Sequence, residues 1–278
     1  SDLAGAERTY TIESLMQDGK ALQLCTSHVL AHSFPASFDV RYQDADGTIR
    51  VPYCTSWGFT TRSVGAVIMT HGDNDGLIIP PAVAPHAVVI VPIFKTDEER
   101  AAVTEKADSL RRQLEDAGIA TVMDADPSTT PGAKFFHWEM RGVPVRLEIG
   151  PKDLGNNTVV LVNRMIKDKA TKKQFVPMEG LVAKTKELLD TIQKELLARS
   201  RARMQSQWHQ GDKIADFGPR LDGSNGIYQT GWCGASSCEA LAKNFKGTIR
   251  CLLDQKQHAS CFGCSEKSVS DILVAKAY

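Results

Sequence analysis

The cysteines of this 278-residue chain are concentrated near its C-terminus, and their spacing limits how that region can fold. Five of the seven cysteines lie in the last 46 residues, and four of these form two close pairs: Cys233 with Cys238, and Cys261 with Cys264. Each pair can contribute two thiolates to one shared metal ion from a tight turn, because Gly234 and Gly263 permit the bend. Four thiolates favour tetrahedral Zn²⁺ and leave no open coordination position, so the predicted role is structural.

The total cysteine count supports a metal site over a disulfide framework. Seven is an odd number and the chain shows no secretory signal, whereas disulfide-stapled domains are usually secreted and carry paired cysteines. The alternative is a set of reduced, buried or redox-active thiols, but two such close pairs rarely arise without a metal. Cys251 lies in the strand-like apolar run of residues 248–253, and we expect it in the core.

Composition and charge are those of an ordinary water-soluble chain. Hydrophobic residues make up 42% of the sequence, and no apolar run approaches the roughly 20 residues that cross a bilayer. The first residues include no initiator Met and no signal peptide, so we expect a cytoplasmic protein that could be a piece of a longer one. Lys plus Arg equals Asp plus Glu at 33 each, and the basic clusters at 164–173 and 194–203 are typical of solvated faces.

The first third of the chain has the pattern of antiparallel β-structure. Alternating and β-forming residues predict four strands: Tyr10–Met16, Ala21–Leu24, Phe38–Gln43 and Thr48–Thr55. The turn pairs Asp18-Gly19 and Asp46-Gly47 suit the connections, so we expect the first two strands to form a hairpin. Residues 71–76 must then form a loop, and the following prolines indicate a linker.

From residue 86 onward the pattern changes to alternating strands and helices. The apolar run at 87–94 predicts a strand buried on both faces, and Thr96 with Glu99 forms the capping box of a helix that Gly118 ends. The same reasoning predicts four further strands, at 119–123, 143–149, 158–163 and 174–177. It also predicts two more helices, at 134–140 and 181–196. We therefore predict a mixed, largely parallel sheet wrapped by helices.

The polar, glycine-containing stretch at 205–225 suits a linker or surface segment between this unit and the cysteine region. A chain of this length can hold two or three hydrophobic cores. The three patterns together predict a multidomain protein of the α+β and α/β classes.

Three runs in the first third resemble segments of one enzyme family: ALQLCTSH at 21–28, TSWGFTTR at 55–62 and MTHGDNDGL at 69–77. They are similar to the last catalytic segments of class II prolyl-tRNA synthetases of the eukaryotic and archaeal type. These proline-tRNA ligases activate proline with ATP to prolyl-adenylate and transfer it to their tRNA. Leu24 and Cys25 depart from the family pattern, which has small residues at these positions.

Two later regions resemble the remainder of the same family. Trp138-Glu139 with GVPVRLEIGPKDL at 142–154 resembles its anticodon-binding domain, and the cysteine pairs with the terminal Ala277-Tyr278 resemble its zinc-bearing tail. The resemblance implies three domains: a remnant of the class II antiparallel sheet in residues 1–84, a mixed-sheet α/β anticodon-binding domain in 85–197, and a small α/β zinc-binding domain in 198–278.

The resemblance also implies which residues hold the substrates. Four positions correspond to ATP-binding residues: Gln23, Thr26, Thr60 and Arg62. Three correspond to the proline pocket: His28, Ser56 and Gly58. Adenylate formation depends on positioned phosphates, neutralised by Mg²⁺ and arginine, more than on an acid or base, so no catalytic side chain is assigned. Taken alone, His28 would be a core or turn histidine and Arg62 a surface ion pair.

Three charged residues correspond to family positions that read the anticodon: Glu139, Arg146 and Lys152. A carboxylate accepts hydrogen bonds from guanine N1 and N2, and cations donate to guanine O6 and N7, so the trio suits the two guanines of proline anticodons. As isolated charges they would be solvated strand ends. Trp138 could stack on a base, although a tryptophan at the border of a core is the commoner case.

The implied partners are tRNA-Pro, ATP and L-proline, with a homodimer in the complete family enzyme and no membrane. The first two class II motifs of the family have no counterpart in this sequence, so we expect the chain alone to be inactive. The alternative is a naturally truncated, non-catalytic module that binds tRNA or another synthetase.

Overall fold

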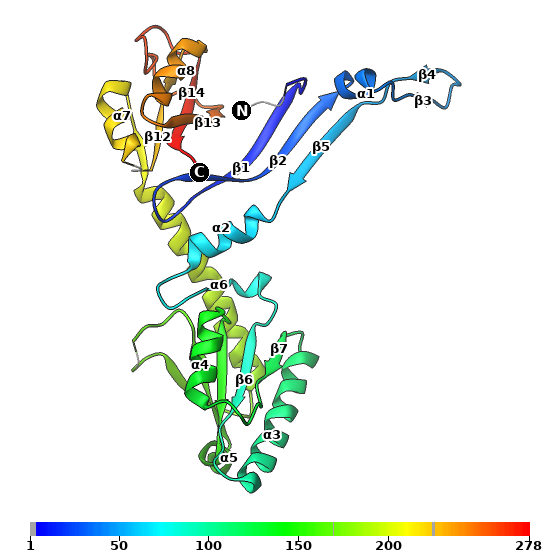
Figure 1. Cartoon of the computed structure of the whole chain (residues 1–278), viewed down its shortest axis with the longest axis vertical. Helices are drawn as coiled ribbons and strands as arrows, with labels where there is room; N and C mark the ends of the chain where they lie inside the picture. The colour runs from blue at the N-terminus through cyan, green and yellow to red at the C-terminus, as the bar shows by residue number, and fades with distance from the viewer. Residues whose placement is uncertain (1–3, 169, 224–225) are drawn as a thin grey trace. The chain divides into compact units, whose positions relative to one another are not determined.

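The computed structural model describes residues 4–168, 170–223 and 226–278 (Figure 1). The chain divides into two compact units, one that combines the residues up to Thr70 with Ala202–Tyr278, and one that comprises His71–Arg201. No helix in these described ranges is both long enough and apolar enough to cross a membrane.

The first unit begins with a three-stranded antiparallel sheet in the order β1-β2-β5. Its strands are β1 (Arg8–Leu15), β2 (Ala21–Ala31) and β5 (Cys54–Phe59). The predicted hairpin is confirmed, with Gly19 at a φ of 78° in the turn between β1 and β2. Helix α2 (Arg62–His71) follows β5, and its Ala66 packs against Met16 and Leu22 of the hairpin.

The strands predicted at 38–43 and 48–55 are largely wrong. Helix α1 (Ser33–Ser37) precedes a two-residue pair, β3 (Tyr42–Gln43) with β4 (Ile49–Arg50). The Asp46 carboxylate accepts hydrogen bonds from the backbone N–H of Thr48 and from Arg50, which fixes the predicted turn. All four strand residues are exposed, so this short hairpin has no apolar face that would extend the pairing.

One face of the first sheet is apolar and exposed. Strand pairing aligns two rows of side chains, one through Ser27 of β2 and one through Cys25. Four large residues flank them on β1 and β5, with exposed fractions of 57%, 60%, 81% and 78%: Tyr10, Ile12, Trp57 and Phe59. We call these four residues the apolar face.

The second unit contains the predicted mixed sheet, which has five strands in the order β10-β9-β8-β6-β7. Its strands are β6 (Val88–Pro92), β7 (Thr121–Met123), β8 (Val145–Ile149), β9 (Thr158–Asn163) and β10 (Lys173–Pro177). Strands β7, β6 and β8 run parallel, and β9 and β10 continue the sheet antiparallel. Every residue of β6 is buried, because side chains cover both faces of the strand.

The elements around this sheet are η1 (Pro81–Val83), α3 (Asp97–Asp116), α4 (Pro131–Met140), α5 (Pro151–Asn156) and α6 (Leu181–Ser206). The Thr96 half of the predicted capping box of α3 is confirmed, because Thr96 Oγ1 accepts a hydrogen bond from the Glu99 N–H at 3.2 Å. The Glu99 carboxylate accepts instead from the Lys95 N–H at 2.7 Å. The large core includes residues of α3 and α6, whereas Phe135 and Trp138 of α4 pack with Val89 and Val91 in a second cluster.

The C-terminal part of the first unit holds a four-stranded sheet in the order β11-β12-β14-β13. Its elements are β11 (Trp208–Gln210), α7 (Ile214–Asp222), β12 (Ile227–Trp232), α8 (Ser236–Lys243), β13 (Gly247–Leu253) and β14 (Ser270–Lys276). The small core includes Phe217 and Leu221 of α7 with Tyr228 and Phe262.

Two expectations for this part are wrong. The stretch at 205–225 contains β11 and α7, whose Phe217 and Leu221 lie one helical turn apart in the core, and only its residues 224–225 lie outside the described ranges. Cys251 is exposed, since β13 is an edge strand with a register shift between Ile249 and Cys251.

Candidate functional site

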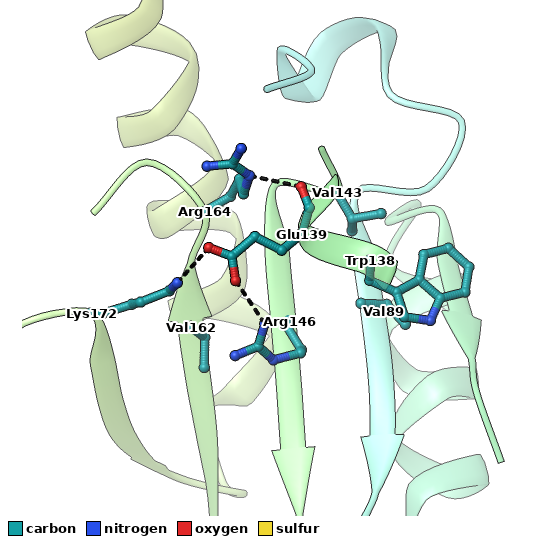
Figure 2. Close-up of a pocket in the computed structure, with 8 residues that line it drawn as sticks. All are labelled: Val89, Trp138, Glu139, Val143, Arg146, Val162, Arg164 and Lys172. Atoms are coloured by element: carbon teal, nitrogen blue, oxygen red, sulfur yellow. Dashed lines mark hydrogen bonds and ion pairs between the residues drawn. The ribbon is translucent and has the colours of Figure 1, made fainter. Parts of the chain in front are cut away.

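A small pocket lies where α4 meets the sheet of the second unit (Figure 2). Its lining comes from β6, α4, the α4–β8 connection, β8, β9 and the residues at either end of the β9–β10 connection. The lining residues are Val89, Trp138, Glu139, Val143, Arg146, Val162, Arg164 and Lys172. Glu139 and Arg146, which the sequence singles out, therefore share one pocket. Their side chains point toward one another.

The Glu139 carboxylate sits between two cations. Lys172 Nζ lies 2.7 Å from its Oε1, and Arg146 Nη1 lies 3.9 Å from its Oε2. The Arg146 guanidinium also lies over the Phe135 ring, 4.2 Å from the ring centroid. The pocket thus offers carboxylate acceptors and cationic donors side by side, against apolar walls from Val89 and Val162.

Arg164 joins three segments at one edge of the pocket (Figure 2). Its Nε donates to the backbone carbonyl of Glu139 at 2.9 Å, and its two Nη atoms donate to the Asp73 carboxylate at 3.1 and 2.8 Å. The Arg164 side chain is only 2% exposed, and Lys167 pairs with the same carboxylate at 2.8 Å. Partial burial would raise the pKa of Asp73, but hydrogen bonds from Arg164 and Lys167 hold that pKa well below its usual range.

Replacing Asp73 with Asn should destabilise the second unit by about 2 kcal/mol, because the buried Arg164 cation loses its counter-charge. The folded-state pKa of Asp73 lies below its ordinary value of 3.8. This contribution is therefore complete above about pH 4 and is lost as the pH falls through the folded-state pKa. Urea unfolding at several pH values measures it.

Asp75→Asn is the matched control, since Asp75 belongs to the same loop, is 51% exposed and pairs with Lys167. Its effect should stay below about 1 kcal/mol. Equal losses in the Asp73 and Asp75 variants would contradict a special role for the Asp73–Arg164 pair.

Trp138 is held in place rather than free in solvent. Its indole Nε1 donates to the Asp124 carboxylate at 2.8 Å, and its ring meets those of His86 and His137 edge-on. The Arg141 guanidinium lies 5.6 Å from the ring centroid. Trp138 is therefore an ordered, half-buried wall of the pocket.

Lys152 does not line the pocket with Glu139 and Arg146. Arg146 lies near the start of β8, whereas Lys152 is an exposed residue in the first turn of α5, beyond the end of that strand. The pocket instead contains Arg164 and Lys172, which in the sequence belong to a basic cluster read as a solvated face. The pairing of Arg146 with Val162 brings β9 beside β8, and this non-local register has no signal in the sequence.

The residues assigned to ATP and proline lie on β2, on β5 and at the start of α2. Thr26 pairs with Gly58 and His28 with Ser56 across the two strands, so these four share one face of the sheet. Three hydrogen bonds link the remainder of the set: Gln23 Nε2 to Thr26 Oγ1 at 3.0 Å, Arg62 Nη1 to the Gln23 carbonyl at 3.3 Å, and the Arg62 N–H to Thr60 Oγ1 at 3.4 Å. His28 Nδ1 lies 3.0 Å from Thr9 Oγ1.

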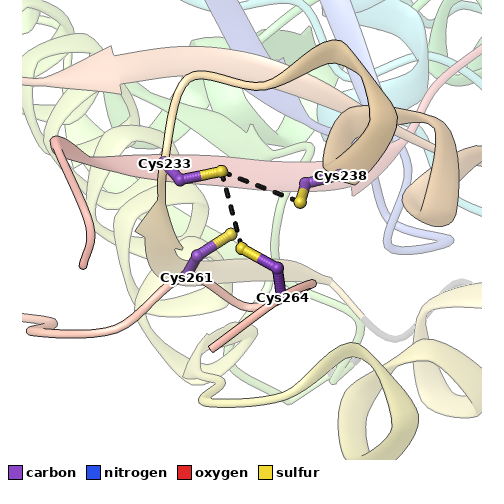
Figure 3. A group of neighbouring side chains, drawn as sticks. All are labelled: Cys233, Cys238, Cys261 and Cys264. Atoms are coloured by element: carbon purple, nitrogen blue, oxygen red, sulfur yellow. Dashed lines mark hydrogen bonds between the residues drawn. The ribbon is translucent and has the colours of Figure 1, made fainter. Parts of the chain in front are cut away.

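The four cysteines of the two predicted pairs form a single cluster (Figure 3). Their Sγ atoms all lie within 4.8 Å of one another, and Cys233 Sγ is 3.7 Å from both Cys238 Sγ and Cys264 Sγ. Cys233 follows β12, Cys238 lies in α8, and Cys261 and Cys264 lie in the loop before β14. The cluster therefore joins three segments of the C-terminal part of the first unit.

The donor set fits a tetrahedral zinc ion. Four sulfurs at about 2.3 Å from one Zn²⁺ are separated by about 3.8 Å, close to the distances between these thiols. Gly234 adopts a φ of 87°, and a Cβ at Gly263 would lie 3.1 Å from Cys238 Sγ, so both glycines serve the close approach. No disulfide links the four.

The ionisation of the thiols differs across the cluster. Burial, assisted by the neighbouring thiols, raises the pKa of Cys238 to about 12. Burial would also raise the pKa of Cys261, but the backbone N–H groups of Cys264 and Gly263 lower it to about 7. Four ionised thiols at this spacing would repel one another, so holding them all as thiolates requires a cation among them.

Residues 87–188 match the family model described as an anticodon binding domain. The chain is 41% identical to proline–tRNA ligase 2 of Clostridioides difficile, 41% to the proline–tRNA ligase of Acetoanaerobium sticklandii and 42% to that of Flavobacterium psychrophilum. Each match covers 99% of this chain but 56% of the relative, so the chain spans little more than half the length of these relatives. The chain is thus a homologue of proline–tRNA ligases over nearly its whole length, with an anticodon-binding domain in its second unit.

Proposed function

We propose that this chain recognises the anticodon of proline tRNA as part of a prolyl-tRNA synthetase. The observation that carries the proposal is the pairing of Glu139 with Arg146 in one pocket inside the matched anticodon-binding domain. The Glu139 carboxylate can accept from guanine N1 and N2, and the Arg146 guanidinium can donate to guanine O6 and N7. Lys152, which is exposed at α5, contacts a neighbouring base or phosphate.

The test is binding of an anticodon stem-loop of proline tRNA to the full chain. The control ligand is the same stem-loop with adenines in place of the two guanines. The proposal requires tighter binding of the guanine stem-loop. Equal affinity for the two would contradict base recognition.

A second site in the same function is the polar face of the first sheet. Gln23, Thr26, Thr60 and Arg62 orient ATP with its Mg²⁺, and His28, Ser56 and Gly58 line the proline pocket. Hydrogen bonds already join Gln23, Thr26 and Arg62 into one group, which supports a shared ligand. The Arg62 guanidinium is exposed and can turn from the Gln23 carbonyl toward triphosphate oxygens.

The cysteine cluster holds one structural Zn²⁺ through Cys233, Cys238, Cys261 and Cys264. The distances between the sulfurs support this assignment, and four protein ligands leave no position for a substrate. In this proposal residues 1–84 belong to a class II catalytic domain, 85–197 to the anticodon-binding domain and 198–278 to the zinc-binding domain. The family match at 87–188 supports the second of these.

The 278 residues alone should not form prolyl-adenylate. They match 56% of each relative, and the three-stranded sheet offers only part of a nucleotide site. Proline-dependent exchange of pyrophosphate into ATP should remain at background. Exchange above background that disappears in the Arg62→Ala variant would contradict this expectation.

The second candidate is a non-catalytic module that binds tRNA or another synthetase, and the matched anticodon-binding domain at 87–188 would serve this function equally. Stem-loop binding is common to both candidates. Synthetase activity that appears when the complementary part of a relative is supplied favours the enzyme segment. Its absence, with binding intact, favours the module.

A further inference from the structure

Glu148 is a buried carboxylate beside the pocket that does not line it. The residue is only 3% exposed, lies on β8, and is separated from Arg146 by Leu147. Side chains alternate along a strand, so Arg146 and Glu148 lie on one face of the sheet while Leu147 packs into the core on the other. This is the face that α4 covers, since Arg146 pairs with Val89 of the Phe135–Trp138 cluster.

Both oxygens of the Glu148 carboxylate are engaged. Its Oε1 accepts from Arg146 Nε at 3.0 Å and lies 2.9 Å from Arg146 Nη2, and its Oε2 lies 2.8 Å from Lys173 Nζ. A carboxylate this deep is costly unless it is paired, so these contacts account for its charge. They also fix the carboxylate from both sides.

The same contacts determine where the Arg146 guanidinium can go. Glu148 occupies Nε and Nη2, the Phe135 ring supports one face of the guanidinium, and Nη1 lies nearest the Glu139 carboxylate. Arginine has a flexible side chain, and ordering it at the moment of binding costs free energy. A guanidinium already held in the pocket avoids part of that cost.

We propose that Glu148 is a positioning residue for anticodon recognition: it holds the Arg146 guanidinium in the orientation that reads a base. The inference rests on the proposed function of Arg146. Glu148 itself does not reach the nucleotide, because it is buried and is not one of the residues that line the pocket. Its whole effect on recognition passes through Arg146.

The test is a double-mutant cycle on the full chain with Arg146→Ala, Glu148→Gln and the double variant. The probes are the proline anticodon stem-loop and its adenine-substituted form. Glu148→Gln should weaken binding of the guanine stem-loop about tenfold and reduce its advantage over the adenine form. In the Arg146→Ala background the same change should have no further effect.

The outcomes separate the two claims. Additive losses, or a loss shared equally by both stem-loops, would show that Glu148 acts independently of Arg146 and overturn the inference. If Arg146→Ala weakens binding and Glu148→Gln does not, the inference fails while the proposed function survives. If Arg146→Ala has no effect, both fail.

Glu148→Asp provides a second variant in case Glu148→Gln does not fold, since it retains the charge and shortens the side chain by only one methylene. It should bind the guanine stem-loop with an affinity between those of the wild type and Glu148→Gln. Glu187→Gln is the matched control, because Glu187 is an exposed carboxylate of α6 that pairs with Lys184. A folded Glu148→Asp variant with wild-type affinity and discrimination would overturn the inference if the Gln variant does not fold.

Discussion

Replacing Arg146 with Ala should weaken binding of the proline anticodon stem-loop by roughly 10- to 100-fold, the range expected for losing an arginine contact to a guanine. The loss should be small for the stem-loop that carries adenines instead. A phosphate contact would weaken both ligands alike and would lower the dependence of binding on salt. Fluorescence anisotropy at two salt concentrations distinguishes these effects.

Glu139→Gln provides a sharper version of the same experiment. The glutamine amide keeps the size of the side chain but turns one acceptor into a donor, which would face the N–H groups of guanine. The variant should therefore lose its preference for guanine even where total binding falls little. Arg112→Ala is the matched arginine control, since Arg112 is 70% exposed on α3 and pairs with Asp108. A preference for guanine that survives both Glu139→Gln and Arg146→Ala would contradict the proposed readout.

Removing the metal should unfold the small C-terminal domain. Structural zinc sites bind with apparent free energies of about 10–16 kcal/mol, as much as the whole stability of an ordinary domain. The ion would connect the β12–α8 turn to the loop that carries Phe262 of the small core. Without the ion, the four thiols lie close together but no bond connects the three segments that carry them. Hydrogen exchange of β12 and β14 should accelerate after chelation, whereas that of β6 and β8 should not.

Cys238→Ser should have the same effect as chelation, since Cys238 is 5% exposed and contributes to both the cluster and the small core. Elemental analysis should find about one zinc per chain in the wild type and little in the variant. Cys251→Ser is the matched control, because Cys251 is exposed on an edge strand outside the cluster. Protection of β12 and β14 that persists in metal-free protein would contradict the assignment. Because the ligands must be thiolates, acid should also release the metal.

Features whose chemistry is local could be predicted from the sequence. The buried β6 and the Thr96 cap of α3 follow from an apolar run and a capping residue. The cysteine cluster follows from two spacings, since each pair is held by its own turn and only the meeting of the pairs is non-local. The hairpin at Gly19 is equally local, because the turn residue and the flanking strands are contiguous.

Features that depend on tertiary context could not be predicted from the sequence. Helix α7 comes from a polar stretch, and its two core residues, Phe217 and Leu221, are buried only because the neighbouring sheet packs against them. Cys251 lies in an apolar run, but its position on an edge strand depends on the strand order. Arg164 and Lys172 reach the pocket through the pairing of β8 with β9. One feature of the pocket is local: the alternation of Arg146, Leu147 and Glu148 along a single strand by itself indicates two charges on one face of the sheet.

The apolar face of the first sheet also governs how this polypeptide behaves in water. Its four large side chains gain free energy by leaving the solvent, at about 25 cal/mol for each square ångström covered. Strands β1 and β5 each keep one edge without a partner strand in the described ranges. At high concentration, lone copies of the chain should therefore adhere to one another or to detergent and chaperones, and their colloidal stability should fall as temperature or sulfate concentration rises.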